Sequence, residues 1–216
     1  TTLLFLLPVL LSTLSPFVTP ASAAEPIRAI REEIPVGSAA SVQLKTKAGD
    51  MIVEGWSEPT VGVDVRIGCA VGTEVETCRK ASEDVRLAWA RERDQLVVRV
   101  RGTTGLHARH LWIEVRFKVP ASLPLELESV TGNMKVTNHR SDLEADAGSG
   151  DVEVVQKKAD VQSVEIDVGA GRSDLWIGGG KVEGSGLFRG VNWSGGDGKA
   201  KIEVDIGAGN ATVRLE

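Results

Sequence analysis

The sequence LELESVTGNMKVTNHRSDLEADAGSGDVEV, residues 125–154, contains two copies of one short pattern. In each copy, apolar and polar residues alternate, a glycine-centred turn follows, and a second alternating run completes the unit. Gly132 centres the first turn, and Gly148-Ser149-Gly150 forms the second. Alternation with a period of about two residues is typical of strands with one buried face, and glycine allows the positive φ of a tight turn. Each unit is therefore predicted to be a strand, a turn and a strand.

The same unit recurs elsewhere in the chain. The segment VQLKTKAGDMIV, residues 42–53, aligns without gaps on LELESVTGNMKV, residues 125–136, and further copies start at Asp146, Asp167 and Asp205. Lys181–Leu187 is a candidate for a degenerate copy between the last two. The glycines that we expect to form the turns share these repeat positions; they are Gly49, Gly132, Gly148, Gly150, Gly169, Gly171, Gly207 and Gly209.

A repeat of roughly 20 residues with a strand, a turn and a strand is typical of a β-solenoid, in which no unit buries its apolar face alone. We therefore predict an all-β protein with a parallel β-helix-like solenoid in its C-terminal half and a β-rich N-terminal region. The alternative is an antiparallel β-sandwich with glycine turns. The repeat becomes continuous after Pro120, so the expected regions are residues 25–120 and residues 121–216.

Residues 1–24 resemble a secretory signal peptide. The apolar run beginning at Leu3 is broken by Pro8 and Pro16, and Ala21-Ser22-Ala23 has the small residues of a cleavage site. No initiator Met precedes the run, so we interpret its start as clipped. The broken run is too short for a membrane span. We expect no further span after cleavage, and a protein that is periplasmic, secreted or at the cell surface.

The charge pattern limits the classes of partner that we expect, and the cysteines predict a disulfide. The net charge of -5 comes from interspersed acidic and basic residues, which argues against nucleic acid as a partner. Cys69 and Cys78 are the only cysteines. In an oxidising compartment such a close pair predicts a disulfide that closes a short loop.

Three segments resemble the bacterial "putative adhesin" family of β-strand-repeat envelope proteins, a domain of unknown function. They are GDMIVEGW (49–56), FKVPASLPLEL (117–127) and GSGDVEV (148–154). The resemblance covers most of the chain from Ile34 onward. It implies a right-handed parallel β-helix-like fold without catalytic activity, and it transfers no functional residues.

Metal binding and catalysis receive little support from the residues. The Asp positions around the turns lack the regular spacing of calcium-binding nonapeptides, and His107 and His110 lack a third ligand. We predict no metal site and no cofactor. A row of stacked carboxylates could still act on a polysaccharide; its members would be Asp146, Asp151, Asp167, Asp174 and Asp205. Turn residues are the simpler interpretation, and we predict that the protein is not an enzyme.

The tryptophans are the remaining candidates for binding. Trp56 and Trp176 follow turns, and Trp193 lies in a glycine-rich segment, where exposed indoles could contact sugar rings or a partner protein. Trp89 and Trp112 lie in alternating strands and are expected in the core. The predicted function is a non-catalytic, adhesin-like scaffold for an envelope protein or a glycan. A polysaccharide-acting enzyme and a purely structural or stress-response envelope protein are the alternatives.

Overall fold

The protein is mostly β-structure with one short α-helix. The computed structural model describes residues 25–105, 108–182 and 190–216. The expected signal peptide therefore lies outside the described residues. None of the helices in the described ranges is long and apolar enough to cross a membrane.

The elements of the first half, in chain order, are β1 (Arg28–Pro35), β2 (Ser41–Ala48), β3 (Asp50–Trp56), β4 (Thr60–Cys69), α1 (Val75–Ser82), β5 (Arg86–Glu92), β6 (Gln95–Arg101), the 3-10 helix η1 (Ala108–His110) and β7 (Leu111–Pro120). Those of the second half are β8 (Leu125–Thr131), β9 (Met134–Thr137), β10 (Leu143–Ser149), β11 (Val152–Gln156), the 3-10 helix η2 (Lys158–Asp160), β12 (Val161–Ile177), β13 (Gly180–Val182), β14 (Val191–Ser194) and β15 (Ala200–Leu215).

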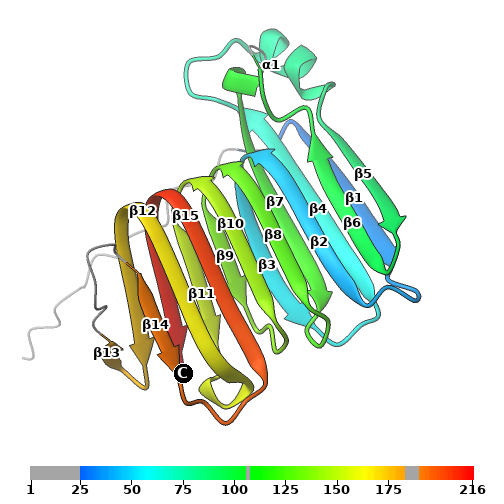
Figure 1. Ribbon diagram of the computed structural model, residues 1–216. Helices are drawn as coiled ribbons and strands as arrows, with labels where there is room; N and C mark the ends of the chain where they lie inside the picture. The colour runs from blue at the N-terminus through cyan, green and yellow to red at the C-terminus, as the bar shows by residue number, and fades with distance from the viewer. Residues whose placement is uncertain (1–24, 106–107, 183–189) are drawn as a thin grey trace, which may run out of the picture.

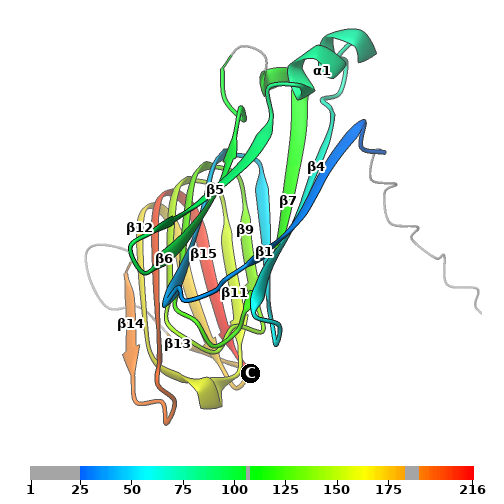
Figure 2. The ribbon, with the colours of Figure 1, turned by 90° about the vertical axis from the view of Figure 1, so that its right-hand side faces the viewer.

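One continuous mixed sheet bends over on itself and nearly closes (Figures 1 and 2). Its parallel strands form two layers. Layer A contains β6, β2, β8 and β10, and layer B contains β7, β3, β9 and β11. The long strands β15 and β12 pass through both layers, because the first part of β15 pairs with β10 and its second part pairs with β11.

The parallel pairing follows the sequence repeat. Leu125 lies opposite Val42 on one side and Leu143 on the other, and Asp205 lies between Asp146 and Asp167. The repeat strands pair in parallel, so the antiparallel sandwich that we considered as the alternative does not describe the repeat region. Pairing of β2 with β8 also carries the sheet across residue 120, so strands from both expected regions share it.

The spatial order of the units differs from their order in the sequence. β15, the last strand of the chain, lies between β10 and β12, and β2 lies directly beside β8 although 76 residues separate Ala48 from Leu125. The all-β prediction is confirmed, but the structure shows a nearly closed mixed sheet in place of the predicted C-terminal solenoid, whose coils would follow one another in chain order. Residues 183–187 of the proposed degenerate copy lie outside the described residues, and its described part, in β13, pairs antiparallel with β12.

Antiparallel strands cover both ends of the parallel stack. β5 pairs with β6, and β4 pairs with β7 and β1, at one end; β14 and β13 pair with the two parts of β12 at the other. Side chains join β1 to β5 where the sheet stays open: the indole Nε1 of Trp89 donates to Glu32 Oε1 at 2.6 Å. Trp89 is 41% exposed, so its expected place in the core is wrong.

The core lies between the two layers. Inward-pointing residues of equivalent positions stack on one another, as Met51 does beside Met134 and Val53 beside Val136. Burying such side chains contributes about 1.5–3 kcal/mol each for the larger ones. Each unit therefore buries its inner face against the units beside it.

The predicted disulfide is confirmed. Cys69 at the end of β4 is bonded to Cys78 in α1, with their Cα atoms 5.5 Å apart. The bond fastens α1 to the sheet at the top of both views (Figures 1 and 2).

Candidate functional site

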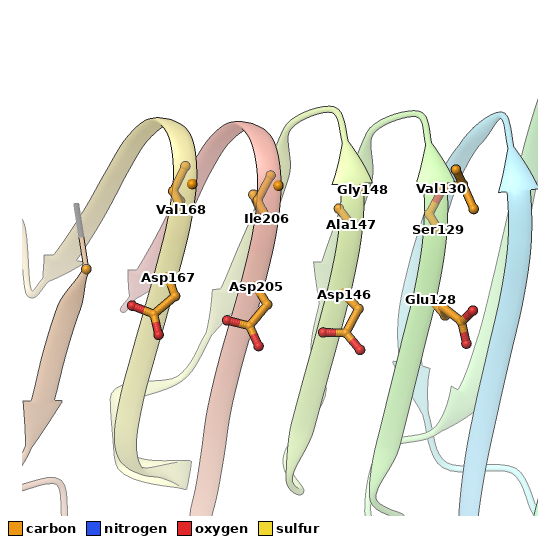
Figure 3. Close-up of a pocket in the computed structure, with 13 residues that line it drawn as sticks. Glu128, Ser129, Val130, Asp146, Ala147, Gly148, Asp167, Val168, Asp205 and Ile206 are labelled. Carbon is orange, nitrogen blue, oxygen red and sulfur yellow. The ribbon is translucent and has the colours of Figure 1, made fainter. Parts of the chain in front are cut away.

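Layer A carries two parallel rows of carboxylates on its outer surface. Because β8, β10, β15 and β12 are parallel and in register, their outward positions stack across the sheet at about 4.8 Å per strand. One row contains Glu126, Glu144, Glu203 and Glu165, and the other contains Glu128, Asp146, Asp205 and Asp167. Figure 3 shows the second row pointing to one side of four successive strands. We call these eight residues the carboxylate face.

Repulsion and burial act together on the middle of this surface. Partial burial, followed by the charges of neighbouring carboxylates, raises the pKa of four side chains above their ordinary values; they are Glu144, Asp146, Glu203 and Asp205. These four side chains have no ion pair within the described part of the chain. The raised pKa values mean that the charged form of these four side chains carries a free-energy cost, which a cationic partner would reduce.

On one side of the carboxylate face, β2 supplies an ion pair and β6 supplies a hydrogen bond. The Lys45 ammonium forms an ion pair with Glu128, and the side-chain amide of Gln95 donates to Glu126 at 3.2 Å. Among the described residues, such partners reach only the β8 members of the two rows. On β10, β15 and β12 the carboxylates have no ion pair with a described residue.

A shallow hollow of about 790 Å³ runs beside the second row. Its floor is formed by the next outward positions, which are Val130, Gly148, Gly207 and Gly169 in the order of the strands. A Cβ at Gly148 would lie 2.6 Å from the Val130 carbonyl oxygen, closer than side chains pack. An elongated ligand can therefore approach the backbone while lying beside four carboxylates.

The eight glycines that we predicted to form turns fall into two groups, and the prediction is wrong for one of them. Gly148, Gly169 and Gly207 lie inside strands and lack positive φ, so close approach of neighbouring strands explains them. The group at the bends does have positive φ, between +109° and +150°; it consists of Gly49, Gly132, Gly150, Gly171 and Gly209. Their residue type follows from the backbone conformation.

Asp and Asn alternate along the bend next to these glycines. Asn133 Nδ2 donates to Asp50 Oδ1 at 3.2 Å, and Asn210 Nδ2 donates to Asp151 Oδ1 at 2.9 Å. The backbone N–H of Asp151 also donates to Asn133 Oδ1 at 3.0 Å. Asp151 is therefore a structural bend residue rather than a member of a carboxylate row.

The structure brings together only part of the expected acidic row. Asp146, Asp167 and Asp205 are neighbours, whereas Asp151 lies at the bend and Asp174 lies on layer B in an ion pair with Lys181. Sequence reasoning missed the glutamates. Their signal was a repeated acidic-apolar-acidic triplet, Glu144-Ala145-Asp146, which recurs at Glu165 and Glu203.

The three tryptophans considered for binding lie in different places. Trp193 pairs opposite Val164 and packs against the core. Trp176 is half-buried on layer B, with Lys181 Nζ 6.0 Å from its ring centre. Trp56 lines a separate hollow, and its Nε1 donates to the Thr60 carbonyl at 2.8 Å. They do not form one aromatic surface.

The described residues contain no group of three His, Cys, Asp or Glu side chains arranged to hold a metal ion. His107 lies outside the described residues, and His110 is part of η1. His139 is buried, with 1% of its surface exposed. The carboxylate face is therefore the candidate functional site that we consider further.

Comparison with known proteins gives a fold likeness only. No family model and no curated protein matches the chain. A "putative cell adhesion protein" from Clostridium sporogenes superimposes with a TM-score of 0.55 and 13% identity, covering 88% of this chain and 99% of that one. A "putative adhesin" from Bacteroides fragilis has a TM-score of 0.33 and 7% identity, covering 89% and 99% of the two chains. Structural neighbours are thus described as adhesins, as the sequence resemblance implied. The disulfide fits an extracytoplasmic protein.

Proposed function

We propose that the protein is a non-catalytic, adhesin-like binding module, and that the carboxylate face is its binding surface. The observation that carries this proposal is the in-register repetition of carboxylates beside a glycine-floored hollow, most of them without an ion pair to a described residue. The ligand class is a protein or glycan with cationic groups at repeated intervals. Association between such a partner and a row of charges is fast and depends on salt.

Residues 1–24 would act as the signal peptide that exports the chain to the periplasm or the cell surface. The rest would form one unit, in which residues 25–120 supply the disulfide-bearing end with the first copy of the repeat, and residues 121–216 supply the other copies. The fold likeness to a cell adhesion protein and the disulfide support this assignment. The TM-score of 0.55 concerns the fold, so the ligand rests on the surface chemistry alone.

The polysaccharide-acting alternative has one observation in its favour, since paired carboxylates with raised pKa lie beside a hollow. General acid catalysis also needs a second carboxylate whose pKa stays low. Asp146 and Asp205 instead occupy equivalent positions, and the pKa of each is raised for the same first reason, burial. Equivalent environments favour binding over catalysis.

The decisive experiment measures binding of two cationic probes, a lysine-rich peptide and a chitosan oligosaccharide, by the protein carrying Asp146→Asn and Asp205→Asn. Both substitutions keep the side-chain shape while removing charge. We expect roughly tenfold weaker binding of at least one probe, and an affinity of the unmodified protein that falls with added salt.

The matched control is the pair Glu54→Gln and Glu58→Gln, two exposed carboxylates outside the carboxylate face. This control should bind within twofold of the unmodified protein. Equal loss in both pairs would mean that net charge alone acts, and no binding by the unmodified protein would reject the proposed surface. Release of reducing sugar from chitosan would favour the enzyme.

A further inference from the structure

A second hollow lies at the opposite end of the layer B strands from the glycine bends. It has a volume of about 550 Å³ and is formed by the segments that follow β3, β7, β9 and β11. Backbone hydrogen bonds hold these segments together: Ala121 N donates to the Trp56 carbonyl and Arg140 N donates to the Ala121 carbonyl, each at 2.9 Å. The walls of the hollow are therefore fixed by the same stacking that builds the sheet.

The charge of this hollow is opposite to that of the carboxylate face. Arg140 and Lys157 both line it, both are exposed, and neither has an ion pair with a described residue. Lys118 lies nearby, with its Nζ 5.6 Å from the ring centre of Trp56. In a protein with a net charge of -5, this concentration of unpaired cations favours an anionic ligand.

The hollow also contains groups that recognise hydroxyls and sugar rings. Ser57, Ser122 and Asn138 provide exposed donors and acceptors, Asp160 provides a half-buried carboxylate, and Trp56 provides an indole. Free phosphate would need only the cations. Hydroxyl partners and an aromatic ring beside them match a saccharide that carries an acidic group.

A buried imidazole lines the hollow and leaves one ring nitrogen without a hydrogen-bond partner among the described residues. His139 lines the hollow and is 1% exposed. Its Nε2 lies 3.2 Å from the Asp142 carbonyl oxygen, which accepts only, so Nε2 carries the proton. Nδ1 is then a buried acceptor that no described residue bonds. Burial lowers the pKa of His139 to about 4, which keeps the ring neutral.

We propose that this hollow is a binding site for an acidic saccharide, with Arg140 and Lys157 contacting its oxyanion and the polar rim contacting its hydroxyls. The acidic group is a carboxylate or a sulfate ester, since both present oxygens to a guanidinium in the same way. The site goes beyond the proposed function, because it shares no residue with the carboxylate face and takes a ligand of opposite charge.

Calorimetric titration with three probes of equal length tests the site: an oligogalacturonate, a heparin-derived oligosaccharide and a neutral oligogalactan. We expect one or both acidic probes to bind and the neutral one to bind roughly tenfold more weakly or not at all. The acidic probe that binds identifies the oxyanion. Absence of binding by both acidic probes would overturn the proposal.

The variants are Arg140→Gln with Lys157→Gln, and as a matched control Lys158→Gln, which neutralises an adjacent exposed cation that does not line the hollow. The double variant should bind the acidic probe roughly tenfold more weakly, and the control should bind within twofold. Equal weakening by both variants would reject the site in favour of general charge attraction. The double variant Asp146→Asn with Asp205→Asn should bind the acidic probe as tightly as the unmodified protein does. This result is expected whether or not the carboxylate face binds a ligand.

Discussion

The outer surfaces of layers A and B are built by the same parallel stacking but carry different charge patterns. Layer A repeats like charges, as Glu144 beside Glu203 shows. Layer B alternates them: Lys135 Nζ lies 2.8 Å from Glu153 Oε2, and Arg214 Nε lies 3.5 Å from Glu153 Oε1. In-register stacking therefore does not by itself produce a carboxylate face.

The difference has opposite effects on the ionisation of the two surfaces. On layer B, the hydrogen bond from Lys135 is the first cause that lowers the pKa of Glu153. On layer A, burial and then like charges raise the pKa of Glu144. The charges on layer B therefore stabilise the folded protein, whereas the charges on layer A destabilise it. Uncompensated charge like that on layer A is typical of a surface shaped for binding.

The largest expected effect comes from removing the bend that joins the layers. Gly150→Val should lower the free energy of unfolding by about 3 kcal/mol or more, because φ at Gly150 is +129° and a Cβ would lie 2.1 Å from the Gly132 carbonyl oxygen. Denaturant unfolding measures the loss. Both surfaces should be affected, since the bend precedes one and follows the other.

Gly178→Ala is the control for backbone strain alone, since φ there is +56° and no atom lies within 4 Å of the added Cβ. It should cost about 1 kcal/mol. If Gly150→Val cost no more than this control, the close approach between neighbouring bends would be excluded as the reason for glycine.

An intermediate effect is expected on layer A. Asp146→Asn with Asp205→Asn should raise the free energy of unfolding at pH 7 by about 0.5–1 kcal/mol, because two repelling charges are removed from a partly solvated surface. The same pair should flatten the pH dependence of stability.

The sign of that pH dependence follows from the raised pKa values. A folded-state pKa above the unfolded value means that the folded protein binds more protons between the two values. The unmodified protein should therefore gain stability from these groups as the pH falls through a window that extends upward from 3.8, the ordinary Asp value. Thermal unfolding of both proteins at several pH values measures this. A gain that persists in the double variant would contradict the assignment.

The smallest effect is expected on layer B, with the opposite sign. Lys135→Gln should lower the free energy of unfolding by less than about 1 kcal/mol, because the ion pair with Glu153 is half exposed. Added salt should reduce the difference from the unmodified protein. A stabilising effect of Lys135→Gln would show that the two surfaces do not differ as their charge patterns indicate.

Much of the fold could be predicted from residues 42–53 and 125–136. Their gapless alignment predicted which residues share a position, and the structure pairs Val42 with Leu125 and Met51 with Met134. The predicted disulfide also formed. The candidate site was predicted only in part, because Asp146, Asp167 and Asp205 were considered as a row while the glutamates beside them were not.

The tryptophan predictions illustrate what sequence reasoning could not reach. Trp56 and Trp193 both lie near glycines in the sequence, yet one lines a hollow and the other packs against the core. Which neighbours cover an indole depends on strands distant in the sequence. The cationic hollow was missed for the same reason, since Arg140 and Lys157 meet only after stacking.

By itself, the sequence determined the repeat, the positive-φ glycines at its bends, the disulfide and most of the inward positions, because alternation and glycine act locally. Only the tertiary structure decided the order of the units, which places β15 between β10 and β12, and hence which outward charges are neighbours. That order depends on how complete strands bury their inner faces against each other, and burial between distant segments leaves no local pattern.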